Sequence, residues 1–240
     1  MDIEVLADAE SAAERAASLI VDHAWESIAA RGLFVMALSG GRTPWIMLRR
    51  LATAQLPWRA VHIVQVDERV APAGDPDRNL THIFESLLPG SPLNPDEIHA
   101  MPVESRDLRT AAHSYGVTLR RIAGDPAVID LAHLGLGADG HTASLVPGDP
   151  VLDVDDADVG LSGPYQGWRR MTLTYPILNR ARSILWLVTG EEKAGMVKRL
   201  LDGDRGIPAG RVSQERAQLV ADRAAAPGRR AGKAGGAICV

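Results

Sequence analysis

The chain has 240 residues, of which 46% are hydrophobic and 23% charged, and its formal net charge is −4 at neutral pH. This composition is typical of a globular protein with one large domain or two small ones, and the acidic balance argues against broad nucleic-acid or anionic-membrane binding. The single cysteine, Cys239, excludes an intrachain disulfide and an all-cysteine metal site.

The two ends of the chain differ in character. The N-terminal segment MDIEVLADAESAAER is acidic and polar and does not resemble a signal peptide. No apolar run approaches the length of about 18 residues that a membrane span needs, so we expect a cytoplasmic protein. Residues 227–240 are rich in glycine and cations and have little to bury, which predicts a disordered tail after a single α/β domain over 1–226.

Helix-like and strand-like segments alternate along the domain. Asp8 can cap a helix that runs to about Arg31, because apolar residues recur at helical spacing between them. Short apolar runs predict strands at 33–38, 60–66, 130–136 and 184–189, and further helices are predicted at 43–51, 80–87, 107–122 and 191–201. This alternation predicts a doubly wound, mostly parallel sheet with helices on both faces, a Rossmann-like α/β fold.

A segment rich in glycine or in charged residues follows each of the four predicted strands, at 39–44, 67–69, 137–142 and 190–193, and one of these segments contains a histidine. In open α/β sheets, ligands bind beyond the carboxyl ends of the strands. The sequence therefore predicts a ligand site at that edge of the sheet.

The segment Ser39-Gly-Gly-Arg-Thr43 joins a predicted strand to a predicted helix that begins with Thr43 as cap and Pro44. Two glycines allow backbone N–H groups to approach an anion, and the helix dipole adds positive potential, which suits a phosphate. A plain strand-to-helix turn with a Thr cap explains the same residues. The segment is not a P-loop, because it lacks G-K-[ST].

His141 is the histidine that falls in a glycine-rich strand-end loop. It can act as a general base near neutral pH, and Asp139 can fix its tautomer; the competing interpretation is a histidine that only stabilises the loop. No histidine pair has a metal-ligand spacing such as H-E-x-x-H, so we expect no metal site. The run 135–140 matches G-x-G-x-x-G, but Pro147 cuts short the helix that a dinucleotide site needs.

Three cations fall near the same strand ends: Arg69, Arg170 and Lys193. Each alone is more often a solvated surface charge, as is the whole triplet Asp67-Glu68-Arg69. Together they could hold a phosphate ester. A serine hydrolase is disfavoured because the G-x-S-x-G elbow is absent.

Several segments together resemble the 6-phosphogluconolactonase family, within the superfamily that includes glucosamine-6-phosphate deaminase and ribose-5-phosphate isomerase. They are ALSGGRTP (37–44), VDERVAP (66–72), LGLGADGHTASLVPG (134–148), RMTLTYPILNRARSILWLVTGEEKA (170–194), IPAGRV (207–212) and VADRAAA (220–226). The SLVPG after the histidine loop resembles the lactonase branch rather than the deaminase branch.

The resemblance implies a fold of the sugar-phosphate isomerase type and hydrolysis of 6-phospho-D-glucono-1,5-lactone in the pentose phosphate pathway, without metal or cofactor. It also implies a functional link to glucose-6-phosphate dehydrogenase. The catalytic residues it implies are His141, as general base, with Asp67 and Arg69. The substrate-binding residues are Ser39, Gly40, Gly41, Thr43, Gly140, Arg170 and Lys193.

Two positions depart from the family pattern. Arg78-Asn79 stands where the family usually has Ser-Asn, and Val146 replaces the phenylalanine of its S-L-F-P motif. Two other functions stay open from the sequence: an amino-sugar-6-phosphate deaminase or isomerase on the same scaffold, and a non-catalytic sugar-phosphate sensor.

Overall fold

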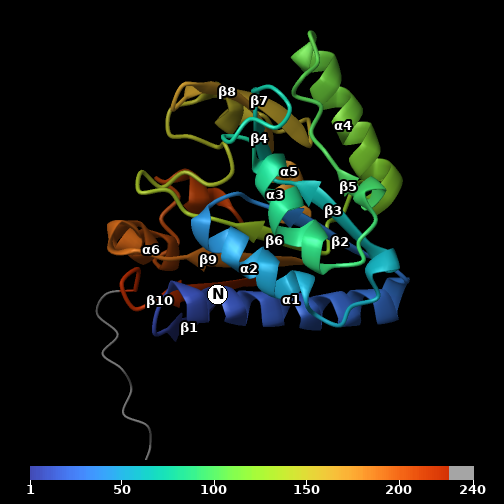
Figure 1. The fold of residues 1–240 in the computed structure, drawn as a ribbon. Coiled ribbons are helices and arrows are strands. Elements are labelled where there is room, and N and C mark those ends of the chain that lie inside the picture. Colours follow the sequence, from blue (N-terminus) through green and yellow to red (C-terminus); the bar gives the residue numbers. More distant parts are fainter. Residues whose placement is uncertain (227–240) are drawn as a thin grey trace, which may run out of the picture.

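A parallel sheet is the centre of the protein in the computed structural model, which describes residues 1–226 (Figure 1). The tail predicted at 227–240 lies outside the described residues. The seven-stranded sheet has the order β1-β10-β9-β6-β2-β3-β5 and is parallel throughout. Its strands are β1 (Asp2–Leu6), β2 (Phe34–Leu38), β3 (Val61–Gln65), β5 (Ile98–His99), β6 (Leu131–Leu134), β9 (Ser183–Val188) and β10 (Ala217–Asp222).

Helices connect the strands and cover both faces of the sheet. The α-helices are α1 (Ala9–Arg31), α2 (Arg42–Ala52), α3 (Asn79–Leu87), α4 (Leu108–Ala123), α5 (Tyr175–Arg180) and α6 (Ala194–Leu201). The short 3₁₀ helices are η1 (Trp58–Ala60), η2 (Leu88–Gly90), η3 (Pro95–Glu97), η4 (Pro150–Asp153), η5 (Glu191–Lys193) and η6 (Pro208–Arg211). Within residues 1–226, no helix combines the length and the apolarity that crossing a bilayer requires.

Alternate residues of β2 show why the strands read as continuous apolar runs. Phe34 and Met36 pack into the core under α1, α2 and α3, whereas Val35 and Ala37 pack into the core under α4, α5 and α6. A strand with helices on both faces must be apolar at every position. The predicted doubly wound, mostly parallel α/β fold is therefore confirmed.

A second, antiparallel sheet was not predicted. It has the order β4-β8-β7, from β4 (Asp67–Arg69), β8 (Trp168–Leu173) and β7 (Val159–Tyr165). The triplet 67–69, expected as a segment after a strand, is itself a strand that leaves the main sheet and pairs with β8. Arg69 thereby lies opposite Arg170, although the two residues are far apart in sequence.

The helix starts are close to those predicted. Asp8 caps α1 by accepting a hydrogen bond from the Ser11 N–H at 2.8 Å. The expected cap Thr43 lies inside α2 instead, because Gly41 is the N-cap. Its φ of 134° is a conformation that L side chains rarely adopt. Glycine is therefore required where the chain turns into α2.

The carboxylate of Glu68 is wholly buried where α3 begins. It accepts hydrogen bonds from three backbone N–H groups, those of Arg69, Asn79 and Leu80, at 2.8 to 2.9 Å, and from Nε2 of Gln65 at 2.7 Å. A negative charge at a helix N-terminus is favourable, and a buried carboxylate requires such donors. Glu68 therefore joins β4 to the start of α3.

Arg78, which departs from the family pattern, is the cation beside this carboxylate. Its side chain is 3% exposed, and its Nε lies 3.5 Å from Oε2 of Glu68. Its Nη1 donates to Glu104 at 2.5 Å and to the Ala71 carbonyl at 3.3 Å. The departure is thus part of a buried ion pair.

Replacing Arg78 by alanine should lower the free energy of unfolding by about 3 kcal/mol, because it leaves the Glu68 charge buried without its cation. Urea denaturation followed by circular dichroism measures this loss. The matched control is Glu104→Gln: Glu104 is 56% exposed, so solvent screens its charge and its replacement should cost no more than about 1 kcal/mol. Equal losses in the two variants would contradict a buried Arg78–Glu68 pair.

Candidate active site

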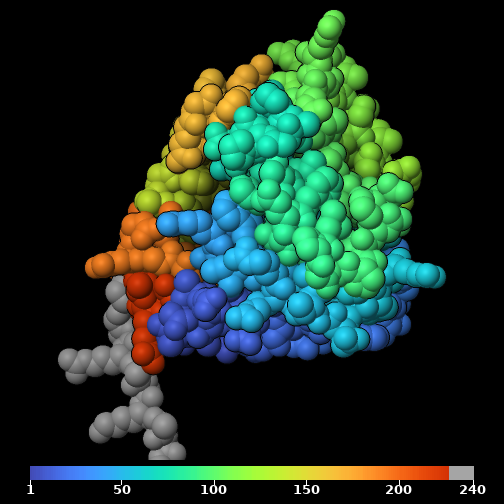
Figure 2. All heavy atoms as spheres, in the orientation of Figure 1, coloured from blue at the N-terminus to red at the C-terminus, as the bar shows by residue number. Residues whose placement is uncertain are grey.

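A cleft of two adjoining lobes lies at the carboxyl ends of β2, β6 and β9, at the predicted edge of the sheet. The lobes measure about 280 and 330 Å³ and share the residues Ser39, Gly40, Gly41, Arg42, His141 and Ala143. Figure 2 shows the surrounding segments gathered on one side of the molecule, with the start of α2 in blue, α6 in orange and the β7–β8 hairpin in gold.

The first lobe is built around the N-terminus of α2. Thr43 lines it and shares a hydrogen bond of 2.7 Å with Thr189, between their hydroxyl oxygens. Lys193, the last residue of η5, lines the same lobe beside Glu192. Free N–H groups at a helix start, together with one lysine, form an environment suited to an anion.

Two glycines are required by close packing in this region. A side chain on Gly40 would collide with the side chain of Asn79, and one on Gly137 would collide with the ring of His141. The glycines that suggested a phosphate loop and a dinucleotide fingerprint thus allow the side chains of Asn79 and His141 to lie close to the backbone. Gly140, predicted to bind substrate, is buried against Ile207 and is not among the residues that line the two lobes.

The second lobe contains Asp67, Arg69 and Arg170. Asn79 fixes two of these residues: its Oδ1 accepts from Arg69 Nη1 at 2.6 Å, and its Nδ2 donates to the carbonyl of Asp67 at 2.9 Å. Arg170 is 4% exposed, and its Nη1 lies 3.9 Å from Oδ2 of Asp67. Burial lowers the pKa of Arg170, and the charge of Asp67 opposes that effect.

The structure separates two residues that sequence reasoning expected to act together. Lys193 lines the first lobe and Arg170 the second. His141 lies between them, because its ring lines both lobes. The arrangement is therefore a lobe at the N-terminus of α2 with Lys193, a histidine, and a lobe with a pair of arginines.

His141 is oriented by Asp139, as the sequence suggested. Its Nδ1 lies 2.5 Å from Oδ1 of Asp139, and its backbone N–H donates to the same oxygen at 3.1 Å. Because an ionised carboxylate only accepts, Nδ1 carries the proton and Nε2 is left as the basic nitrogen. Partial burial works to raise the pKa of Asp139, but the hydrogen bonds from His141 and Tyr165 outweigh it and lower that pKa.

Tyr165 is a site residue that sequence reasoning missed. It lies at the end of β7, and its hydroxyl donates to Oδ2 of Asp139 at 3.1 Å. Its ring packs edge-on against His141, with centroids 5.2 Å apart, and the guanidinium of Arg170 lies 5.2 Å from its centroid. Burial, followed by the nearby Asp139, raises the pKa of Tyr165, so the phenol keeps its proton. No motif marks Tyr165, because only the hairpin brings it here.

The outer wall of the second lobe was also missed. Trp45 stacks on His82 with ring centroids 3.9 Å apart, and Asp77 accepts a hydrogen bond from Trp168 at 2.9 Å. Trp45, Asp77 and His82 line the lobe, so these contacts join α2, α3 and the hairpin around it.

His133 supports the first lobe from below. It lies in β6, is wholly buried, and accepts a hydrogen bond from the Ser39 N–H at 3.4 Å through Nδ1. Its Nε2 has no hydrogen-bond partner within the described chain. Burial lowers the pKa of His133 to about 4, so the ring is neutral under ordinary conditions.

Similar proteins match this chain over most of its length. A family model described as "Glucosamine-6-phosphate isomerases/6-phosphogluconolactonase" matches residues 7–221. A 6-phosphogluconolactonase of Synechocystis sp. is 37% identical over 195 residues, which cover 80% of this chain and 81% of that protein. The GDH/6PGL endoplasmic bifunctional protein of Homo sapiens is 40% identical over 169 residues, covering 68% of this chain and 21% of that protein.

The fold is shared with a solved structure. The 6-phosphogluconolactonase from Trypanosoma brucei has a TM-score of 0.83 to this chain at 26% sequence identity. The match covers 93% of this chain and 97% of that one.

Lowering the pH should destabilise the protein through His133. Its folded pKa of about 4 lies below the unfolded value of about 6.5, so the unfolded chain binds more protons between the two. Above about pH 6.5 the neutral His133 makes its full contribution to the free energy of unfolding. As the pH falls towards 4, the free energy of unfolding decreases by about 3 kcal/mol in total. Urea unfolding at a series of pH values measures this slope.

His133→Asn should flatten that slope, because asparagine can still accept from Ser39 but does not titrate. His113→Ala, on the exposed surface of α4, should keep it. An unchanged slope in His133→Asn would show that other groups cause the pH dependence.

Proposed function

The chain belongs to the glucosamine-6-phosphate isomerase/6-phosphogluconolactonase family, and we propose that it hydrolyses 6-phospho-D-glucono-1,5-lactone to 6-phosphogluconate with His141 as general base. The observation that carries this proposal is the position of the Asp139-oriented His141 between an anion-binding lobe and a pair of arginines. A phosphorylated lactone has a group for each part of this site. Its phosphate suits the anion-binding lobe, its carbonyl carbon suits attack by water beside His141, and its carbonyl oxygen, which becomes negative, suits the arginines.

The chemistry needs no covalent nucleophile, because a lactone is already an activated ester. Nε2 of His141 takes a proton from water as the water oxygen bonds to C1 of the lactone. The Asp139 carboxylate stabilises the imidazolium that forms. The tetrahedral intermediate then collapses, the bond from C1 to the ring oxygen breaks, and that oxygen takes the proton back from His141.

The oxyanion of the intermediate is assigned to the second lobe. Arg69 is held in place by Asn79, and its neighbour across the β4–β8 pairing is Arg170. Donors fixed before the reaction stabilise developing charge without reorganising. Asp67 supports this arrangement: its Oδ2 accepts from Ser144 at 2.5 Å and lies near Arg170, so we assign it a positioning role.

The phosphate is assigned to the first lobe. Gly40, Gly41 and Thr43 lie around the start of α2, and Lys193 lines the same lobe. Binding energy from this remote group can orient C1 towards His141. The phosphorylated substrate also suggests the functional link: a dehydrogenase that oxidises glucose 6-phosphate at C1 would supply it. We expect both enzymes in the cytoplasm.

An amino-sugar-phosphate deaminase is the alternative on this scaffold. A deaminase needs a free carboxylate base, and Asp67 is the candidate. Here Oδ2 of Asp67 is bonded to Ser144, and Oδ1 accepts from Asn79 Nδ2 at 3.3 Å. Those contacts favour the lactonase, and release of ammonia from glucosamine 6-phosphate would decide for the deaminase.

His141→Ala should lower kcat by about 10²- to 10⁴-fold, the usual contribution of a positioned general base. The assay uses freshly generated 6-phosphogluconolactone and subtracts spontaneous ring opening. His113→Ala, which removes an exposed histidine, should keep full activity. Near-wild-type kcat in a folded His141→Ala variant would remove this residue from the mechanism.

Lys193→Ala should weaken recognition of the phosphate specifically. A charge-assisted hydrogen bond contributes about 1.5–3 kcal/mol, which corresponds to a loss of about 10- to 150-fold in kcat/KM. Unphosphorylated gluconolactone should lose little, so the ratio of kcat/KM for the two substrates should fall.

Arg170→Ala is the informative comparison for the Lys193 experiment. A residue that stabilises the oxyanion should reduce activity on both lactones equally and leave their ratio unchanged. If Arg170→Ala lowers the ratio and Lys193→Ala does not, the phosphate binds in the second lobe and the oxyanion in the first, the reverse of our assignment.

A further inference from the structure

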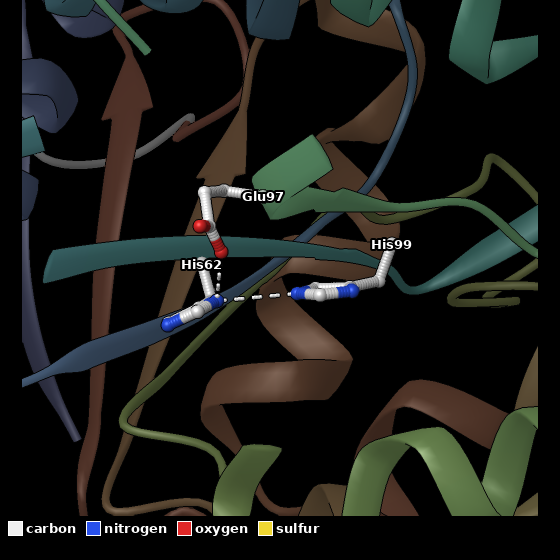
Figure 3. Close-up of side chains that lie close together, drawn as sticks. All are labelled: His62, Glu97 and His99. Carbon is white, nitrogen blue, oxygen red and sulfur yellow. Dashed lines mark hydrogen bonds and ion pairs between the residues drawn. The ribbon is translucent and has the colours of Figure 1, made fainter. Parts of the chain in front are cut away.

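Three potential metal ligands converge at the edge of the main sheet, away from the cleft lining. Nδ1 of His62 lies 2.7 Å from Oε2 of Glu97 and 3.2 Å from Nε2 of His99. The three ligand atoms all lie within 4.8 Å of one another. Figure 3 shows the side chains turned towards a common point, from β3, the end of η3 and β5.

Sheet register creates this cluster, and sequence spacing conceals it. In the parallel pairing of β3 with β5, His99 lies opposite Val64. His62 is two residues before Val64, so both histidines project from the same face. The expectation of no metal site rested on spacing along the chain, whereas the pairing of β3 with β5 brings these two histidines together.

Each of the three groups can present a lone pair to a common ion. An imidazole nitrogen without a proton is an acceptor, and so is an ionised carboxylate. A cation between the three groups would accept all three lone pairs. In a tetrahedral zinc site with bonds of about 2.0–2.1 Å, neighbouring ligand atoms are about 3.3 Å apart. The distances of 2.7 and 3.2 Å from Nδ1 of His62 are close to that spacing, and the third pair of atoms lies within 4.8 Å.

We propose that His62, Glu97 and His99 bind one divalent transition-metal ion, for which Zn²⁺ is the best match. Two imidazole nitrogens and one carboxylate favour zinc over Mg²⁺ or Ca²⁺, which prefer all-oxygen sites. The side chains of His62 and Glu97 are 23% and 28% exposed, so water can reach a fourth position. The positive charge of Arg121 acts on His99 and weakens the site relative to one without a neighbouring cation.

The ion would act on the edge of the sheet rather than on the reaction. β5 has two residues and pairs with β3 alone among the described strands. A metal shared by His62 and His99 fastens this short edge strand to β3. None of the three ligands lines either lobe of the cleft, so zinc at this position should change thermal stability and leave hydrolysis unchanged.

The test uses the full chain, without an affinity tag and stripped of metal by a chelator. Zn²⁺ is titrated at pH 7.5 by calorimetry, and Co²⁺ is added separately to read its visible absorption in a tetrahedral site. We expect one ion per chain and an increase in Tm with zinc. Glu97→Gln and His99→Ala should each weaken zinc binding at least tenfold and abolish the increase in Tm.

Matched controls separate this site from other histidines. His113→Ala and His141→Ala should bind zinc as the unmodified chain does; the second excludes the Asp139–His141 pair as the ligand. Lactone hydrolysis by Glu97→Gln and His99→Ala, measured without metal, reports that both variants are folded. The proposal is overturned by the absence of saturable binding, by binding that persists in Glu97→Gln and His99→Ala, or by binding that disappears in His141→Ala.

Discussion

The carboxylate of Glu68 lies in the interior where the chain leaves the parallel sheet, and its hydrogen bonds determine how the second lobe is built. Its neighbours in sequence, Asp67 and Arg69, line that lobe. The carboxylate holds the backbone of Asn79, and Asn79 in turn holds Arg69 and Asp67. A buried charge tolerates little displacement, because each lost donor leaves it without compensation. The hydrogen bonds of this buried carboxylate and of Asn79 therefore hold Asp67 and Arg69 in place.

The antiparallel sheet has a comparable influence on the reacting end of the cleft. Pairing of β4 with β8 places Arg170 beside Arg69, and the β7–β8 hairpin brings Tyr165 onto Asp139 and His141. Asp139 thus orients His141, and the hydroxyl of Tyr165 in turn holds Asp139. This set of contacts suits a hydrolysis in which a single side chain gives and takes a proton while arginines stabilise charge.

The two ends of β3 carry groups of different chemistry. Its carboxyl end leads to Asp67 and the cleft, whereas His62 near its amino end joins Glu97 and His99. A parallel sheet makes both groupings possible, since it aligns like ends of strands that are distant in sequence. The pairing of β3 with β5 brings His62 close to His99, with Glu97 beside them at the end of η3.

The sequence by itself determined the strands 33–38, 60–66, 130–136 and 184–189, because strands covered on both faces must be apolar throughout. It also determined the edge at which polar loops gather, and the adjacency of Asp139 and His141 is local enough to be read from a loop of the chain. The strands β1, β5 and β10 of the parallel sheet were not predicted. β1 and β5 are edge strands, short or partly exposed, and carry a weak apolar pattern, whereas β10 is a buried inner strand. Only the tertiary structure decided that Glu68 is buried with Arg78, that Lys193 and Arg170 lie in different lobes, and that Tyr165 reaches His141. These outcomes depend on the pairing of segments far apart in the chain, and side-chain contacts across such pairings leave no periodic signal in the sequence.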